Sequence, residues 1–389
     1  MRFVGIDIAA ETHVVAAVNE AGEMIFKPTA FTEDADGYRR LRELLGPPAA
    51  TLVAMEATGH YWRNVFAVLA AEGFEVALLN PLRTHRYAGE DLERTKTDAI
   101  DALSIARFAS EKRPAVTRLP ENATQELREL IRHRDRLLQD FGDRTRQLHR
   151  LVDLGFPEFT RHVRRLDSAL ATAILYAYPT AHAFHGVGVR RVAKLRYDLR
   201  QVVGTELAHA LIEAARVSVG QHHGAAYQLQ VRHVCEDLDR WRGRLRELDR
   251  NIEAKLADHE VGSLLTTING IGPHTAARIV AELGDPASFR DARALAAYVG
   301  VVPALRHSGK RRPYARLSPQ GHARLRAALW MPTLTAVRTN PWLRQHYQRL
   351  LARGKARKVA LVTCMHKLLL AVYSVARSRT PFVPRPQTP

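Results

Sequence analysis

The sequence predicts a mixed α/β domain at the N-terminal end of the chain and a mainly helical remainder. Short segments rich in Val, Ile and Phe predict three consecutive strands, with a turn at residues 19–22. Strand-like and helix-like segments then alternate, up to a helix for which Thr97 is the predicted N-cap. The predicted strands span 2–8, 13–19, 23–28, 51–56 and 75–79, and the predicted helices span 35–45, about 61–72 and 97 to about 110. This order is typical of a mixed sheet covered by helices.

Two long amphipathic helices are predicted in the middle of the chain. Apolar residues recur at steps of three and four over 126–154 and, more regularly, over 231–252. The two helices flank a helical insert at about 165–228. The pattern fits a helix pair within one chain, which is the commoner arrangement, and it also fits a contact between two protomers. Three heptads do not distinguish these alternatives.

The last third of the chain is predicted to be helical around a central loop. Helices are expected at about 274–284, 291–299, 320–335 and 356–376, and the segment 302–318, which contains prolines and a glycine, is expected to be a loop. We therefore expect four parts: an α/β domain over 1–115, a helical coiled-coil region with its insert over 116–260, a C-terminal helical domain over 261–378 and a tail over 379–389.

The composition excludes several classes of protein. With 389 residues, of which 46% are hydrophobic, the chain is long enough and apolar enough to bury several cores. Its two cysteines, Cys235 and Cys364, are too few for a disulfide framework or a four-thiolate zinc site. The first residues lack the pattern of a signal peptide, and no apolar run reaches the ~18 residues of a membrane span. We expect a reducing cytosol as the compartment.

Charge is distributed unevenly along the sequence. The formal net charge of +18 combines a net charge of −5 over residues 1–110 with +23 over the rest. Beyond Asp291 there are 19 Lys and Arg residues and no carboxylate side chain. Such a basic C-terminal part favours a polyanionic partner. We expect nucleic acid rather than a membrane surface, because no lipid-anchor motif accompanies the basic residues.

Four carboxylates occupy positions that suit a metal site. Asp7 and Glu56 each end an apolar segment that is predicted to be a strand. Asp98 and Asp101 are three residues apart on a predicted helix, so they share a face, and apolar residues continue that face toward the sheet. Four carboxylates brought together would repel one another unless a cation lay between them.

The four carboxylates together predict a nuclease rather than an ATPase. Their oxygens are hard ligands that suit Mg²⁺ or Mn²⁺, and two such ions about 4 Å apart can assist phosphoryl transfer. One acid at the end of each of two strands, followed by two acids on a helix, is the layout of the ribonuclease H-like fold. Taken singly, Asp7 could also be a solvated strand end, and Asp98 could simply favour the helix dipole. An actin-like ATPase would need later glycine-rich phosphate loops, which we do not find.

Two C-terminal motifs contain candidate phosphate-binding residues. Gly270 and Gly272 lie between predicted helices and resemble a helix-hairpin-helix; they suit either a bound phosphate or a tight turn. Ser308 lies in a loop rich in cations. These are Arg306, Lys310, Arg311, Arg312 and Arg316, followed by Arg324 and Arg326 on the next predicted helix. Guanidinium groups could favour a serine alkoxide that attacks a phosphate. Because no base for Ser308 is evident, these residues alone favour an ordinary DNA-binding loop.

These motifs and the segments around them resemble one known family. The chain resembles the DEDD transposases of bacterial insertion sequence family 110, the bridge-RNA-guided recombinases. In the N-terminal part the similarity rests on GIDIAAETH at 5–13, MEATGHYW at 55–62, NP at 80–81 and RTKTDAIDA at 94–102. In the C-terminal part it rests on NGIGPHTAARIVAELGD at 269–285, FRDARALAAYVGVVP at 289–303, HSGK at 307–310 and GHARLRAAL at 321–329. The two motif sets cover most of the chain in the expected order.

The resemblance implies a fold, a reaction and partners. The N-terminal domain would be RuvC-like, with Asp7, Glu56, Asp98 and Asp101 as a catalytic tetrad that binds Mg²⁺ or Mn²⁺. Ser308 would be the nucleophile that cuts a DNA strand and forms a phosphoserine link. The implied partners are donor and target DNA, a noncoding guide RNA and other copies of the chain in a dimer or tetramer. No membrane is implied, and the expected location is the bacterial cytoplasm, at the nucleoid.

The residues alone, without the resemblance, also allow two other functions. A RuvC-like hydrolytic nuclease or Holliday-junction resolvase would use the tetrad with water and would not need Ser308. A nucleic-acid-binding protein without activity, such as a decayed transposase, would keep salt-sensitive binding without cleavage. Replacement of Ser308 distinguishes the nuclease from the recombinase, and replacement of Asp101 distinguishes both enzymes from the binding protein.

Overall fold

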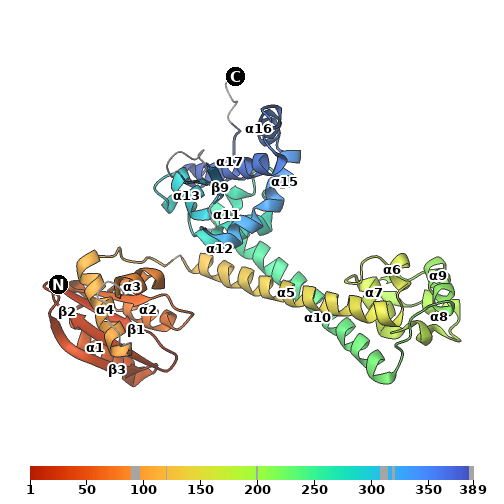
Figure 1. Ribbon diagram of the computed structural model, residues 1–389, viewed down its shortest axis with the longest axis horizontal. Coiled ribbons are helices and arrows are strands. Elements are labelled where there is room, and N and C mark those ends of the chain that lie inside the picture. Colours follow the sequence, from red (N-terminus) through yellow and green to blue (C-terminus); the bar gives the residue numbers. More distant parts are fainter. Residues whose placement is uncertain (89–96, 120, 199, 307–313, 318–319, 385–389) are drawn as a thin grey trace. The chain divides into compact units, whose positions relative to one another are not determined.

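The computed structural model describes residues 1–384 apart from 89–96, 120, 199, 307–313 and 318–319. The chain divides into two compact units, Met1–Leu119 and Pro120–Pro389, and each is described by itself (Figure 1). The first unit contains a five-stranded sheet covered by helices, and the second unit is mainly helical. The predicted α/β class of the N-terminal part and the helical class of the remainder are therefore confirmed. The predicted boundaries within the second unit stay predictions.

The sheet of the first unit has the strand order β3-β2-β1-β4-β5. Its strands are β1 (Arg2–Asp7), β2 (Thr12–Val18), β3 (Met24–Thr32), β4 (Thr51–Glu56) and β5 (Glu75–Leu79). β1, β2 and β3 form an antiparallel meander, whereas β4 and β5 run parallel to β1. The mixed sheet follows from the connections, because tight turns join antiparallel strands and helical crossovers join parallel ones.

Helices cover both faces of this sheet. α1 (Ala35–Leu45) and α2 (Trp62–Ala71) pack on one face, over a core that includes Ile6 and Phe66. α4 (Asp98–Lys112) packs on the other face, over a core that includes Phe3 and Ile105. The short η1 (Pro48–Ala50) precedes β4, and α3 (Pro81–Ala88) contacts α4. The sheet is thus the middle layer of three.

Helix α4 makes a close backbone contact with β1 at Gly5. A Cβ atom at Gly5 would lie 2.2 Å from the carbonyl oxygen of Ala102 and 2.3 Å from the backbone nitrogen of Ala106, so only glycine fits there. The far end of the helix lies over the start of the strand, where the Arg113 guanidinium is 4.3 Å from the ring centroid of Phe3. α4 therefore runs antiparallel to β1, with its first turn toward the C-terminal end of that strand.

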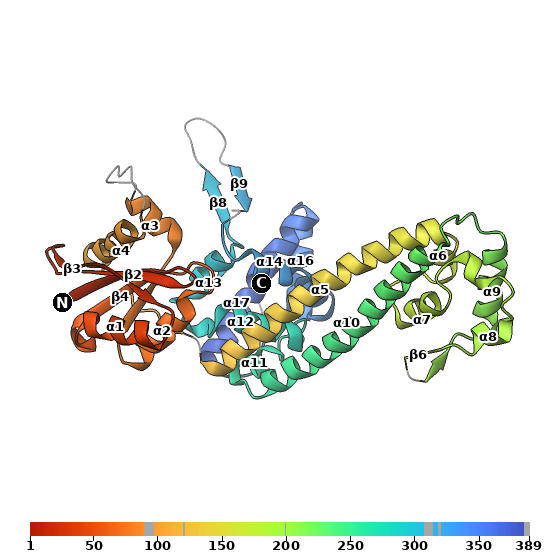
Figure 2. The same ribbon diagram turned by 90° about the horizontal axis from the view of Figure 1, so that it is seen from below.

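The second unit is built on two long helices, α5 (Asn122–Gly155) and α10 (Ala225–Ala257). They lie side by side and run antiparallel (Figure 2). Arg134 pairs with Asp249 at 2.5 Å, and Arg144 pairs with Asp237 at 3.2 Å. Partly exposed ion pairs of this kind contribute at most about 1 kcal/mol each. The predicted pair of long helices is thus formed within one chain.

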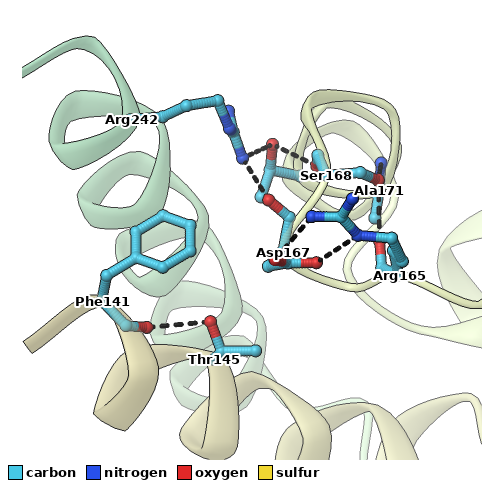
Figure 3. A network of polar contacts seen from close by, with 8 residues as sticks. Phe141, Thr145, Arg165, Asp167, Ser168, Ala171 and Arg242 are labelled. Carbon is cyan, nitrogen blue, oxygen red and sulfur yellow. Dashed lines mark hydrogen bonds and ion pairs between the residues drawn. The ribbon is translucent and has the colours of Figure 1, made fainter. Parts of the chain in front are cut away.

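Between the two long helices, the chain folds into an insert with a core of its own. The elements of the insert are α6 (Phe159–His162), α7 (Ala169–Ala177), η3 (Ala181–Phe184), α8 (Val189–Ala193), β6 (Arg196–Tyr197), β7 (Gln201–Val202) and α9 (Thr205–Arg216). Arg242 of α10 donates to the backbone oxygen of Asp167 at 2.8 Å, beside Ser168, which caps α7 (Figure 3). Core packing and polar contacts together fix the insert to the helix pair.

The C-terminal helices gather around α17 (Arg357–Ser378). They are α11 (Glu260–Leu265), α12 (Pro273–Leu283), η4 (Pro286–Ser288), α13 (Ala292–Val299), α14 (Ala323–Ala328), α15 (Trp330–Thr339) and α16 (Pro341–Ala352). By length and composition, α17 is apolar enough to cross a membrane. Its side chains Met365, Leu368 and Val372 are buried in the protein core, which is typical of a core helix.

The predicted loop over 302–318 is wrong in part. Two short antiparallel strands, β8 (Pro303–Arg306) and β9 (Tyr314–Leu317), lie within it. Proline does not prevent this pairing, because Pro303 is the first residue of its strand and Pro313 precedes the other.

The predicted single helix over 320–335 is also wrong. Leu329 lies between α14 and α15, as the C-cap of the first and the N-cap of the second, so two helices replace one. Pro332 explains the break, because in a continuous helix its ring would clash with the carbonyl group four residues earlier. Helix α16, which follows, was not among the predicted helices.

Both cysteines are buried and unpaired. Burial raises the pKa of the Cys235 thiol to about 12 and that of Cys364 to about 11. Neither thiol is therefore a thiolate nucleophile at neutral pH.

Replacing Gly5 with alanine should destabilise the first unit. The added Cβ would overlap the backbone of α4, and overpacking of this kind costs about 1–3 kcal/mol or more. Gly142→Ala in α5 is the control, because the nearest atom to its Cβ is a guanidinium nitrogen of Arg146 at 3.6 Å. That change should stabilise the chain by about 0.5–1 kcal/mol. Thermal unfolding followed by circular dichroism measures both; a Gly5→Ala protein as stable as the wild type would contradict the close contact.

Candidate functional site

The ends of β1 and β4 bring two of the predicted carboxylates side by side. The two strands are parallel neighbours, and Ile6 of β1 is opposite Met55 of β4. The next residue of each strand is an acid, so Asp7 and Glu56 are neighbours at the same edge of the sheet. The structure therefore confirms that both acids end strands and brings those strand ends together.

Both carboxylates lie on the face of the sheet that α4 covers. Phe3 and Leu52, four residues earlier in the same two strands, belong to the core beneath α4. Side chains an even number of residues apart share a face of a strand, so Asp7 and Glu56 point to that side. Each of them is half-buried.

The first turn of α4 carries the other two carboxylates. The Thr97 hydroxyl accepts a hydrogen bond from a backbone N–H of this turn at 3.3 Å, which confirms the predicted N-cap. Ile105 and Phe108, on the same helix face as Asp98 and Asp101, are buried against the sheet as predicted. Asp101 is half-buried and Asp98 is exposed. Because α4 runs antiparallel to β1, its first turn lies toward the edge where the strand acids stand.

The four carboxylates come from elements that meet at one edge of the sheet, and their side chains do not form a metal cage in the described structure. Within the described ranges, no three acidic, His or Cys side chains are close enough together to hold one ion. The donor set nevertheless fits a hard divalent cation, because it consists of carboxylate oxygens and carries excess negative charge. Metal binding by the tetrad stays a prediction.

Thr84 of α3 holds Glu56 in place. The buried Thr84 hydroxyl donates to Glu56 Oε1 at 2.5 Å, and the Thr58 hydroxyl lies 3.4 Å from Oε2. The sequence analysis did not identify Thr84. The available signal was the NP motif at 80–81, because proline favours the first position of a helix and so places Thr84 on the first turn of α3.

A buried histidine fixes the loop that follows Asp7. His13 is 0% exposed; its Nδ1 accepts from the backbone N–H of Ala9 at 3.2 Å, and its Nε2 lies 2.6 Å from Glu33 Oε2. With Nδ1 as the acceptor, Nε2 carries the proton and donates it to Glu33. Asn64 of α2 donates to the other oxygen of Glu33 at 2.8 Å. His13 belongs to the motif GIDIAAETH, but the sequence analysis assigned no role to it.

Ser308, Lys310, Arg311 and Arg312 lie outside the described residues. The two strands on either side of them, β8 and β9, are hydrogen-bonded neighbours. The pairing places the backbone of Arg306 on one strand of this hairpin and that of Arg316 on the other. The roles predicted for these residues stay predictions.

The two glycines between α11 and α12 lie in different surroundings. Gly270 has a φ of 107°, and a Cβ there would lie 2.4 Å from Cβ of Ala336 in α15. Gly272 is the N-cap of α12, and a Cβ there would meet open space. The tight turn therefore accounts for Gly270, whereas the open surface at Gly272 leaves room for a phosphate at the N-terminus of α12.

Arg324 and Arg326 lie in different surroundings on α14. Arg324 is exposed. Arg326 Nη1 donates to the backbone oxygens of Val299, Gly300 and Gln320 at 3.3, 3.4 and 3.2 Å, so it holds a turn together. A phosphate contact therefore suits Arg324 better than Arg326.

Comparisons with known proteins identify the same family twice along the chain. A family model for DEDD transposases of the IS110 type matches residues 4–157, and a model described as "Transposase IS116/IS110/IS902 family" matches residues 262–348. Together they cover more than half of the chain.

Curated relatives match the chain over nearly its whole length. A protein of insertion element IS116 from Streptomyces clavuligerus is 27% identical over 99% of this chain and 96% of its own. A putative transposase for IS117 from Streptomyces coelicolor is 26% identical over 98% of this chain and 95% of its own. A pilin gene-inverting protein from Moraxella bovis is 24% identical over 98% of this chain and 97% of its own.

The mixed sheet and the placement of its acids are consistent with a DEDD nuclease-like fold. The chain belongs to the IS110 family of insertion-sequence transposases. It is therefore an enzyme that cuts and rejoins DNA strands. Membership of a DEDD family also suggests a divalent metal cofactor.

The contacts of Glu33 predict a pH effect on stability. Burial alone would raise the pKa of Glu33, but hydrogen bonds from His13 and Asn64 outweigh it, so the pKa lies below its usual value of 4.5. A carboxyl whose folded pKa is lowered adds stability above its unfolded pKa, and that stability is lost as the pH falls through the folded value. Between about pH 5 and pH 3, the free energy of unfolding should therefore fall less in Glu33→Gln than in the wild type. Urea unfolding at each pH measures this difference. Glu43→Gln, at an exposed position of α1, should leave the wild-type pH profile unchanged; equal profiles for all three proteins would contradict the effect.

Alanine substitutions at Gly270 and Gly272 should have different effects, one on stability and the other on DNA binding. Gly270→Ala should destabilise the second unit by about 1–3 kcal/mol or more, because the added Cβ meets Ala336 at a positive φ. Gly272→Ala meets no atom and should leave the melting temperature close to that of the wild type, while weakening binding to a DNA duplex. Unchanged DNA binding in Gly272→Ala would show that this turn is structural only.

Proposed function

We propose that this chain is an RNA-guided recombinase of an insertion sequence, with a DEDD metal site and a serine nucleophile. The metal site is supported by two observations: Asp7 and Glu56 end neighbouring parallel strands, and Asp98 and Asp101 are on the first turn of α4, the helix that covers this face of the sheet. The serine nucleophile is carried by the similarity of the HSGK segment around Ser308 to the family motif.

The reaction needs a nucleophile, positioned phosphates and a stabiliser of charge. In the first step, Ser308 Oγ attacks a DNA phosphorus and forms a phosphoserine ester, and the displaced sugar oxygen takes up a proton. In the second step, a hydroxyl of another DNA strand attacks the same phosphorus, which rejoins the DNA and releases the serine. Mg²⁺ or Mn²⁺ bound by the tetrad would supply charge stabilisation at the phosphate. Thr84 and His13 position the tetrad rather than touch the substrate.

Cations of the second unit are proposed to bind the phosphates that react. The proposed phosphate contacts are Arg306, Lys310, Arg311, Arg312, Arg316, Arg324 and Arg326, with Gly270 and Gly272 as backbone contacts. No carboxylate follows Asp291, so this region offers uniformly positive charge to a polyanion. Among those of them whose side chains the structure describes, Arg324 is exposed, and the Cα of Gly272 faces open space.

The partners follow from the family. We propose donor and target DNA as substrates and a noncoding RNA as the guide that selects them. The acidic first unit and the basic second unit would form a composite site, which suits a homodimer or homotetramer. The proposed location is the bacterial cytoplasm, in association with the nucleoid.

A hydrolytic nuclease or junction resolvase is the second candidate. The placement of the tetrad favours it as much as the recombinase, because a DEDD site with water suffices for strand cleavage. The two candidates differ in their need for Ser308.

A denaturing gel tests the proposal. Wild type, Ser308→Ala and Asp101→Asn are incubated with nicked and junction-type DNA, Mg²⁺ and the RNA transcribed beside the gene. The wild type should form a protein–DNA adduct that survives denaturation and is absent with Ser308→Ala, and Asp101→Asn should reduce cleavage by about 10²-fold or more. Controls are Ser378→Ala, an exposed serine at the end of α17, and Asp36→Asn, an exposed acid in the first turn of α1.

The outcomes distinguish the candidates. Cleavage without an adduct, unchanged in Ser308→Ala, would establish the hydrolytic nuclease instead. Salt-sensitive binding without cleavage in any protein, over a panel of RNAs from both flanks of the gene, would indicate an inactive binding protein.

A further inference from the structure

The insert contains a segment whose cations are not neutralised by the chain. Elsewhere in the insert, Arg216 pairs with Glu213 at 2.8 Å. Between residues 186 and 204, five cations form no ion pair and no side-chain hydrogen bond with any residue that the structure describes. They are Arg190, Arg191, Lys194, Arg196 and Arg200. The single carboxylate of this segment, Asp198, pairs instead with Arg246 of α10 at 3.2 Å.

Three of these cations lie on the solvent-facing side of α8 and of its C-cap residue, Lys194. Val192 is 0% exposed and belongs to the core of the insert, whereas Arg190, Arg191 and Lys194 are exposed. Positions 190 and 194 are one turn apart, and position 191 is three residues from 194, so all three side chains lie close together. They span about 6 Å along the helix axis. The β6–β7 hairpin continues this surface, because its backbone returns to the end of α8 through hydrogen bonds.

This arrangement of charge matches a phosphate backbone. Like charges this close repel one another, and a polyanion removes that repulsion while releasing its own counterions. B-DNA places one phosphate about every 3.4 Å along each strand, so about 6 Å of α8 spans two successive phosphates. We propose that α8 and the β6–β7 hairpin bind the phosphate backbone of duplex DNA. The DNA that they contact lies outside the stretch of DNA that the predicted catalytic residues would hold. The inference rests on the action of this family on DNA.

The helix pair holds this surface at a fixed distance from the C-terminal core. Ile131 of α5 belongs to the C-terminal core, and Leu148 belongs to the core of the insert. At 1.5 Å per residue, about 26 Å of helix separates them. One turn of B-DNA is about 34 Å long, so a duplex of a single turn reaches one of the two regions, whereas a duplex of several turns can reach both. Contacts at α8 should therefore matter for long DNA and not for short DNA.

Fluorescence anisotropy with the full chain tests the proposal. Binding is measured without Mg²⁺, on DNA duplexes of about 12 and about 40 base pairs and on an RNA hairpin, over a series of salt concentrations. On the long duplex, the triple variant R190A/R191A/K194A should bind about tenfold or more weakly than the wild type and flatten the salt slope by about two to three units. On the short duplex it should bind like the wild type. R190K/R191K, which keeps the charges, should bind the long duplex like the wild type.

A matched control removes the same charge elsewhere. R146A/R216A/R240A deletes three arginines that each pair with an acid three residues away, so its salt slope should stay close to that of the wild type. Equal loss in both triple variants, or equal loss on both duplex lengths, would overturn the proposal. Loss on RNA alone would also overturn it and would assign the surface to RNA. Circular dichroism melts that match the wild type exclude unfolding of the variants. A wild type that binds neither duplex would overturn this proposal, whereas the proposed function is tested separately by the denaturing gel with RNA.

Discussion

The close contact between β1 and α4 is the constraint on which the first unit depends. Because Gly5 has no side chain, the helix backbone rests on the strand and cannot slide without losing the packing of Phe3 and Ile105. That packing sets the direction of the helix and so brings its first turn to the edge where β1 and β4 end. The four carboxylates repel one another, so attraction among them cannot assemble the site. The apolar core sets the positions of the four residues, and in the proposed metal site a cation would lower the repulsion.

The edge of the sheet at which β1 and β4 end is stabilised by residues that do not belong to the acidic tetrad. Thr84 donates to Glu56, and His13, oriented by Glu33, accepts from the loop after Asp7. Hydrogen bonds to charged groups contribute about 1.5–3 kcal/mol each, enough to restrict one carboxylate to a narrow set of orientations. Glu56 is thus held by a direct hydrogen bond, whereas Asp98 on the helix is exposed. Such outer partners are a general feature of metal sites, because they orient the ligands.

Features set by burial could be predicted from the sequence, and features set by single distant contacts could not. The strands and the two long helices follow from periodic apolar residues, and Thr97 follows from a local cap. The four-residue strands β8 and β9 are too short to show a period. Glu56 and Thr84 meet only through the fold, and the need for glycine at 270 depends on Ala336, far along the chain. The role predicted for Ser308 rests on resemblance, because its surroundings in sequence show no base.

The positive charge of the second unit is concentrated at the two ends of its helix pair. Along the pair itself, several arginines pair with acids, as Arg134 does with Asp249. At the C-terminal end, no carboxylate side chain follows Asp291. There, burial and the nearby cations Lys367, Arg349 and Arg353 lower the pKa of His346 to about 4. At the other end, α8 carries its unpaired cations. The stability of the fold alone does not favour cations concentrated at the two ends, because ion pairs dispersed over the surface would reduce the repulsion among these cations. A long polyanion that meets both ends does favour it, and a stiff helix pair keeps the two contacts at a constant spacing.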